Sequence, residues 1–98
     1  MACPQSLQRQ LMQAGGMVEK MFYTYVLQSL KDNKLYIGWT DDLVKRFEKH
    51  CAGKVTATKD RLPLKIMYYE ACLKKEKAIS REKQLKTGFG RKYLNNRI

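Results

Sequence analysis

Two short segments decide the fold of this chain: FYTYVLQ at residues 22–28 and LYIGW at residues 35–39. Both are dense in the aromatic and β-branched residues that favour strands. The residues between them include the turn formers Asp32 and Asn33. The pattern therefore predicts a β-hairpin.

A helix is expected directly after the hairpin. Asp41 or Asp42 can cap it, and Leu43, Phe47 and Cys51 then recur at i, i+4 and i+8, which is the spacing of one apolar face. This helix ends at about residue 51.

The remaining sequence predicts one more strand and two more helices. Residues 52–62 form a basic loop, and residues 64–72 (LKIMYYEAC) are typical of a strand. Good helix formers dominate residues 74–86, Gly88 is a stop signal, and residues 91–97 add a short final helix. The predicted fold is mixed α/β in the order β-β-α-β-α-α, with helices flanking a small three-stranded, mainly antiparallel sheet.

Composition limits the classes of function. The chain has 98 residues, which is enough for one small domain, and its hydrophobic content of 44% is typical of a folded protein. Lys and Arg number 20 against 9 Asp and Glu, giving a net charge of +11. Such a surplus attracts polyanions, whereas no apolar stretch approaches the roughly 20 residues of a membrane helix. We therefore expect a nucleic-acid partner and no membrane.

The N-terminal segment differs from the rest of the chain. Residues 1–20 carry few charges and include the pair Gly15-Gly16, which predicts a flexible tail or a start codon assigned upstream of the native one, followed by a domain at residues 21–98. The segment lacks a secretory signal, and Cys3, Cys51 and Cys72 form no Cys-x-x-Cys pair. We expect a cytoplasmic protein with reduced thiols, of which Cys51 and Cys72 pack as small hydrophobes.

Glu82 is the sharpest anomaly in the predicted helices. Ala78, Ile79 and Leu85 form one apolar stripe, and Glu82 falls about 40° from Ala78, inside that stripe. A carboxylate facing a core needs a cation or a donor opposite it. A Lys or Arg in a structural ion pair fits, and so does a divalent metal ion, which accepts carboxylate oxygen.

Arg46 and His50 lie four residues apart on the first helix and border its apolar stripe. An Arg fork matches a phosphate, and a His can exchange a proton near neutral pH, so the pair suits a phosphodiester. The alternative is that both are ordinary solvated residues.

The hairpin and the basic loop add further candidates. Tyr25 and Tyr36 can bring their hydroxyls together if they share a face of the sheet, although aromatic residues in strands are most often core. The loop cations Lys54, Lys59 and Arg61 are either solvated or track a phosphate backbone.

Several enzyme classes are excluded by what the sequence lacks. Gly88-Phe89-Gly90 is not a dinucleotide fingerprint, and no Walker-type phosphate loop occurs. With one histidine in the chain, a zinc site built from His ligands is excluded and no Ser-His-acid triad is indicated.

Taken together, the hairpin and both helices resemble the GIY-YIG nuclease superfamily, above all its small stand-alone bacterial members. The first half-motif corresponds to residues 23–25 (YTY) and the second to residues 36–38 (YIG), with eleven residues from Tyr25 to Tyr36. Arg46, His50 and Glu82 follow in the family's order, and the resemblance covers about residues 21–95.

The resemblance implies a role for each matching residue. Glu82 would hold a single Mg²⁺ or Mn²⁺, and Arg46 would grip the scissile phosphate. Tyr25, Tyr36 and His50 would surround the attacking water, with either tyrosine favoured over the histidine as the base. The implied activity is metal-dependent endonucleolytic hydrolysis of phosphodiester bonds in DNA, branched or single-stranded, in repair or recombination.

The chain departs from the family pattern at two places. Tyr23 and Thr24 stand where the family name has Gly and Ile, as is common among stand-alone members. Some repair members carry a Lys directly after the second half-motif, where this chain has Trp39. An auxiliary phosphate contact would then come from Lys45 or from the basic loop.

Two functions without catalysis remain open. The first is a basic nucleic-acid-binding module that keeps the fold but does not turn over, and the second is an interaction protein that docks an acidic partner. Repair members of the family attach separate DNA-binding domains, so here we expect target choice to come from the catalytic domain or from a partner protein.

Overall fold

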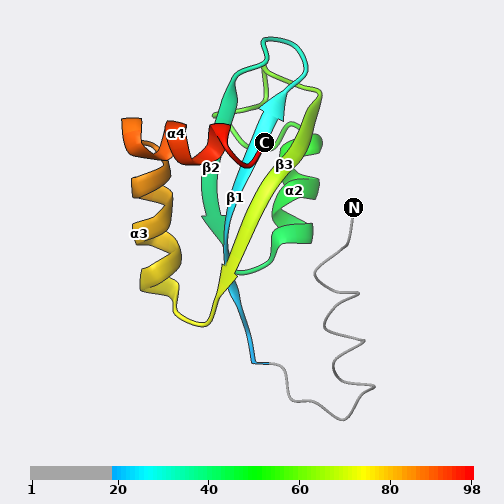
Figure 1. Cartoon of the computed structure of the whole chain (residues 1–98). Coiled ribbons are helices and arrows are strands. Elements are labelled where there is room, and N and C mark those ends of the chain that lie inside the picture. The colour runs from blue at the N-terminus through cyan, green and yellow to red at the C-terminus, as the bar shows by residue number, and fades with distance from the viewer. Residues whose placement is uncertain (1–18) are drawn as a thin grey trace.

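The computed structural model describes residues 19–98, and its elements follow the predicted order (Figure 1). The elements are β1 (Phe22–Ser29), β2 (Leu35–Thr40), α2 (Leu43–Cys51), β3 (Leu64–Cys72), α3 (Lys75–Leu85) and α4 (Gly88–Asn95). The predicted mixed α/β fold is confirmed. The expected N-terminal tail lies outside the described residues, apart from residues 19 and 20.

The sheet has the order β2-β1-β3 and both strand pairs are antiparallel, so the central strand is β1. Asn33 takes a positive φ of 60° in the turn between β1 and β2, a conformation that Asn tolerates better than most residues. The predicted hairpin is therefore present, and β2 forms one edge of the sheet.

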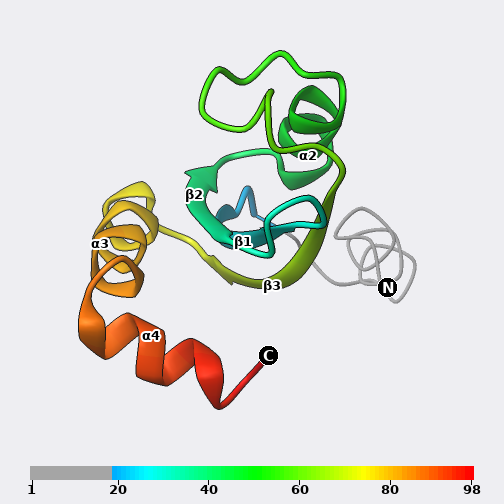
Figure 2. The ribbon, with the colours of Figure 1, turned by 90° about the horizontal axis from the view of Figure 1, so that it is seen from above.

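Alternation along β1 divides the core into two parts. Tyr23, Tyr25 and Leu27 pack with Leu43 of α2, whereas Val26 packs with residues of α3 and α4. The view in Figure 2 shows α2 on one side of the sheet and α3 with α4 on the other. Both faces of the small sheet are thus covered.

The start of α4 differs from the prediction, whereas α3 ends at Leu85, within one residue of the expected end. Gly88 is the first residue of α4 rather than a stop, and Thr87 caps that helix by accepting a hydrogen bond from the Gly90 amide. A Cβ at Gly90 would collide with the backbone of Leu85, so a glycine is needed where the two helices meet. The final helix consequently begins three residues earlier than expected.

The expectation that Cys51 packs as a small hydrophobe is wrong, because Cys51 is exposed. The buried residues of α2 are Leu43 and His50. His50 follows Leu43 by seven residues and therefore points within about 20° of the same direction on the helix. Cys51 follows Leu43 by eight residues and points about 80° away from it. His50 is also buried rather than bordering the stripe, because its polar ring finds partners there. Cys51 and the half-buried Cys72 are both free thiols.

Within residues 19–98, no helix has the length and apolar character needed to cross a membrane.

Candidate active site

A chain of buried hydrogen bonds runs from β1 into the loop after α2. His50 is fully buried and Tyr25 exposes only 1% of its surface. The Tyr25 hydroxyl lies 3.0 Å from Nε2 of His50, and Nδ1 of His50 lies 2.7 Å from Oγ1 of Thr58. Both ring nitrogens therefore have a partner, which compensates the cost of burying the imidazole.

The buried imidazole of His50 is neutral at pH 7. Desolvation by burial, helped by the positive charge of Arg46, lowers its pKa from 6.5 to about 4. A neutral ring has one N–H donor and one acceptor nitrogen. Because Nε of Arg46 donates to the Tyr25 oxygen at 3.4 Å, the phenolic proton can donate to Nε2, leaving Nδ1–H to donate to Thr58.

Arg46 brings a positive charge to the outer end of this chain. Its hydrogen bond to Tyr25 raises the pKa of the guanidinium, against the lowering effect of burial, and Tyr36 also accepts a hydrogen bond from it. Burial raises the pKa of the Tyr25 phenol, while the bond from Arg46 lowers it. Tyr25 is therefore a neutral phenol that holds the guanidinium.

Gly38 allows Tyr25 to reach the edge of the sheet. The two residues are paired across β1 and β2, and the Tyr25 ring lies directly against the glycine. A Cβ at position 38 would lie 2.6 Å from the Tyr25 hydroxyl oxygen and 2.7 Å from Cζ. Any side chain here would displace the phenol, so the glycine is required by close approach.

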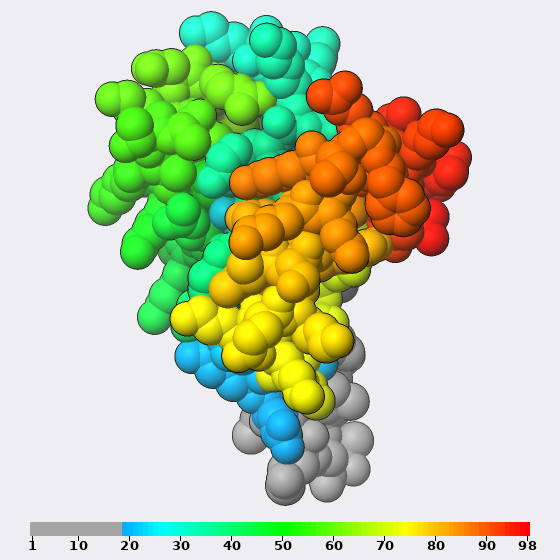
Figure 3. All heavy atoms as spheres, turned by 90° about the vertical axis from the view of Figure 1, so that its left-hand side faces the viewer, coloured from blue at the N-terminus to red at the C-terminus, as the bar shows by residue number. Residues whose placement is uncertain are grey.

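Tyr36 lies beside this group on β2. Its ring centroid is 6.3 Å from that of Tyr25 and 5.1 Å from that of His50. Tyr36 is half-buried, so it is more accessible than Tyr25. Figure 3 shows blue-green atoms of this part of the chain between the green region of α2 with its following loop and the yellow-to-orange α3.

Glu82 approaches the same group from α3. Its charge acts on the Tyr25 phenol and contributes to the raised pKa there, and it exposes only 19% of its side chain. It forms an ion pair with Lys86 on the next turn, whose Nζ lies 3.7 Å from Oε1 of Glu82 and whose side chain is 54% exposed. A long contact to an exposed ammonium is weak, so it does not neutralise the acid as a buried ion pair would.

The site chemistry fits a hard divalent cation. Among residues 19–98, no three His, Cys, Asp or Glu side chains gather to form a metal site of protein ligands alone. Mg²⁺ is commonly bound by one or two carboxylates, with waters and substrate phosphates completing its shell. A single half-buried carboxylate, that of Glu82, matches that donor set.

The structure separates the expected phosphate-binding cations into two groups. Lys45, Lys54 and Lys59 are exposed. Arg61 is engaged, because its Nε lies 3.2 Å from Oδ2 of Asp32 and so joins the loop to the turn of the hairpin. Its charge is therefore less available to a nucleic acid than those of the three lysines.

Sequence reasoning missed Thr58. It is fully buried and holds His50, although the sequence indicated only a basic loop here. The loop has no apolar periodicity, so no local pattern singles out one threonine among its polar residues.

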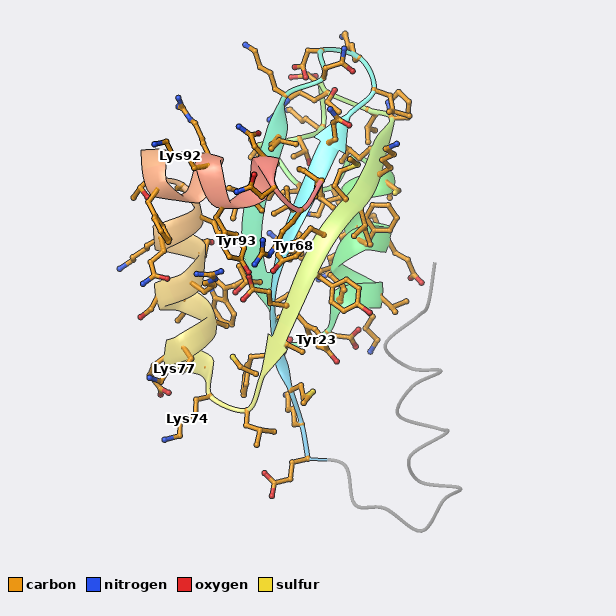
Figure 4. The ribbon with its side chains drawn as sticks, in the orientation of Figure 1. Tyr23, Tyr68, Lys74, Lys77, Lys92 and Tyr93 are labelled. Atoms are coloured by element: carbon orange, nitrogen blue, oxygen red, sulfur yellow. The ribbon has the colours of Figure 1, made fainter. Side chains whose placement is uncertain are left out.

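A second polar cluster positions α3 from the other face of the sheet. Nε of Arg81 lies 3.1 and 3.0 Å from the two carboxylate oxygens of Glu70, and the Tyr68 hydroxyl donates to Glu70 at 2.8 Å. The hydroxyls of Tyr68 and Tyr93 are 3.0 Å apart, and Figure 4 shows these two side chains meeting between β3 and α4. The cluster fixes the helix that carries Glu82.

The fold and the site together define a small nuclease-type domain: tyrosines converge over a glycine on an edge strand, with an arginine and an acid beside them. Residues 21–95 match the family model described as the GIY-YIG catalytic domain. The chain belongs to the GIY-YIG family.

Its curated relatives are UPF0213 proteins, the small stand-alone branch of this family. Examples come from Streptococcus pyogenes serotype M3, serotype M1 and serotype M4. Each is 46% identical over 67 residues, which cover 67% of this chain and 72% of the relative. Their names state no substrate, whereas the family assignment implies a nuclease that acts on nucleic acid.

Proposed function

We propose that this protein is a metal-dependent endonuclease that hydrolyses phosphodiester bonds in DNA, at branched or single-stranded regions, in repair or recombination in the cytoplasm. The observation that carries the proposal is the environment of Arg46. Its guanidinium is held by tyrosine hydroxyls and has no carboxylate partner within residues 19–98, so its charge is available to an anion. The negative charge of Glu82 acts on the same phenol.

Arg46 would bind a non-bridging oxygen of the scissile phosphate. As the water oxygen attacks phosphorus, negative charge grows on the equatorial oxygens, and a fixed guanidinium stabilises that charge. The hydrogen bond to Tyr25 orients the guanidinium before substrate arrives, which reduces the reorganisation needed in the transition state.

Tyr36 is better placed than Tyr25 or His50 to contact the attacking water. His50 is fully buried with both nitrogens engaged, and the Tyr25 hydroxyl lies between His50 and Arg46. We therefore assign positioning roles to these two residues and the water contact to Tyr36. The water loses a proton as the new P–O bond forms, and the departing oxygen gains one as the old P–O bond breaks.

Glu82 would hold the Mg²⁺ or Mn²⁺. A bound divalent ion supplies positive charge to the phosphate oxygens, which one arginine alone does only in part. Lys86 would exchange its contact with Glu82 for one with substrate phosphate, because its ammonium is exposed and its ion pair is long.

Removing the carboxylate tests the proposal. Glu82→Ala should reduce cleavage of labelled single-stranded and branched DNA in Mn²⁺ or Mg²⁺ by about 10³-fold or more, with binding retained, and EDTA should have the same effect on the wild type. Glu76→Ala is the matched control, since Glu76 is an exposed acid in the first turn of the same helix. Equal cleavage by wild type and Glu82→Ala would contradict the assignment.

The alternative is a basic module that binds nucleic acid without turnover. The exposed lysines of α2 and its following loop favour it. It predicts salt-sensitive binding and no metal-dependent product from any of the same substrates.

A further inference from the structure

A cleft opens next to Tyr36, between the start of β2 and the junction of α3 with α4. Its volume is about 590 Å³, which lies within the range of roughly 300 to 1,000 Å³ typical of ligand sites. Its lining comprises Lys34, Leu35, Tyr36, Ile37, Leu85, Lys86, Arg91, Leu94 and Asn95. Because Tyr36 belongs to both, the cleft adjoins the candidate active site at this residue.

The charges of the lining are all of one sign. It contains the cations Lys34, Lys86 and Arg91 and no acidic residue. The side chains of Lys34 and Arg91 are exposed and have no hydrogen-bond or ion-pair partner in the described part of the chain. Unpaired cations in a cleft attract a negatively charged ligand.

The cleft also has an apolar part. Leu35, Ile37, Leu85 and Leu94 contribute it. An inorganic anion would gain nothing from these side chains. A nucleotide with an unstacked base would gain contact with them, because it combines a phosphate with a flat apolar surface. In a duplex that surface is already stacked between neighbouring bases, so only an unpaired nucleotide presents it.

We infer that this cleft binds one unpaired nucleotide of the DNA strand adjacent to the scissile phosphate, with Lys34 and Arg91 contacting its phosphates and the apolar residues seating its base. The position of this nucleotide next to a phosphate that is cleaved rests on the proposed nuclease function, whereas the binding of the nucleotide does not. The cleft thereby selects single-stranded or branched DNA over intact duplex.

Binding without turnover tests the inference. A fluorescein-labelled oligothymidylate and a labelled blunt hairpin duplex are titrated with protein in EDTA, and anisotropy gives the dissociation constants. Arg91→Ala should weaken binding of the single strand by roughly 5- to 10-fold and reduce the salt slope by about 0.7, the value of one lost phosphate contact on a single strand. Duplex binding should change by less than about 2-fold.

Lys92→Ala is the matched control. Lys92 is the exposed neighbour of Arg91 on α4 and is not part of the cleft lining (Figure 4). It removes the same charge from the same helix, so it should change either affinity by less than about 2-fold. Circular dichroism and thermal unfolding check that both variants fold.

An oligonucleotide of abasic residues tests whether the apolar part of the cleft binds the base. It keeps the phosphates and lacks the bases, so the wild type should bind it about 5-fold or more weakly than oligothymidylate. Equal affinity for the two strands would overturn the base contact, and equal losses in Arg91→Ala and Lys92→Ala would overturn the cleft as a specific site.

The two proposals fail separately. If the wild type cleaves no DNA, but Arg91→Ala loses the preference for binding single strands that the wild type and Lys92→Ala show, the nuclease proposal fails and the cleft assignment stands. If the wild type cleaves DNA and Arg91→Ala retains the wild-type preference for single strands, the cleft assignment is overturned and the nuclease proposal stands.

Discussion

Each face of the sheet carries a polar cluster in which an arginine contacts tyrosines, yet the two arginines have opposite environments. On the α3 and α4 side, Arg81 meets both oxygens of Glu70 and also lies over the Tyr93 ring, with its guanidinium carbon 4.3 Å from the ring centroid. On the α2 side, Arg46 contacts tyrosine hydroxyls and no carboxylate within residues 19–98.

This difference separates a structural arginine from one that can bind substrate. A guanidinium already bound to a carboxylate gains little from a second anion. One that is oriented by neutral phenols keeps its full charge for a phosphate. The partner of an arginine, rather than its presence in a tyrosine-rich cluster, therefore indicates its role.

Replacing each arginine in turn gives the largest expected effect. Arg46→Ala should lower kcat for DNA cleavage by about 10² to 10³-fold, because it removes a fixed charge from the transition state. Its thermal stability should stay close to that of the wild type. Arg81→Ala should instead affect mainly stability. It should lower the unfolding free energy by about 1 to 2 kcal/mol and lower kcat by less than about 10-fold.

Cleavage assays and urea unfolding on the two variants decide this comparison. If both arginines affected stability alike and cleavage alike, the distinction between the two faces would be wrong. Arg46→Lys sharpens the result, since it keeps the charge but lacks the fork that the tyrosines orient.

The α2 side should also respond to pH through His50. Its pKa is 6.5 when unfolded and about 4 when folded. Because folding lowers this pKa, the stability from the neutral imidazole is complete above pH 6.5 and is lost as pH falls towards 4. The loss amounts to about 3 kcal/mol. Urea unfolding of the wild type and His50→Gln at pH 7 and pH 4 measures it as a difference between the two proteins.

Thr58→Val is the control for this measurement. It removes the hydroxyl bonded to Nδ1 but keeps the imidazole, so overall stability should fall while the dependence on pH persists. Identical pH dependence in the wild type and His50→Gln would show that His50 is not the responsible group.

A smaller effect is expected from adding one methyl group beneath Tyr25. Gly38→Ala should cost about 1 to 3 kcal/mol in unfolding free energy and should also reduce cleavage, because the new Cβ displaces the phenol that holds Arg46. At Gly88 a Cβ would meet nothing within 4 Å, so Gly88→Ala serves as the control and should leave stability and cleavage nearly unchanged. A well-folded and fully active Gly38→Ala would refute the orienting role of Tyr25.

Local patterns predicted the fold well because each element depends on its own residues. The aromatic strands, the turn at Asp32 and Asn33, and the spacing of Leu43 and Phe47 required no distant partner. The boundary at Gly88 was wrong because it depended on the approach of α4 to Leu85. The roles assigned to individual site residues stay predictions until the variants are measured.

The sequence by itself determined the order of the elements, the excess of positive charge and the set of residues that resemble a nuclease motif. Only the tertiary structure decided that His50 is buried against Thr58, that Arg61 is engaged by Asp32, and that Arg46 has no acidic partner within the described residues. These contacts join different elements, and burial and charge neutralisation depend on the atoms that surround a group in space. Periodicity along a chain reports the face on which a residue lies, but not the residue that it meets there.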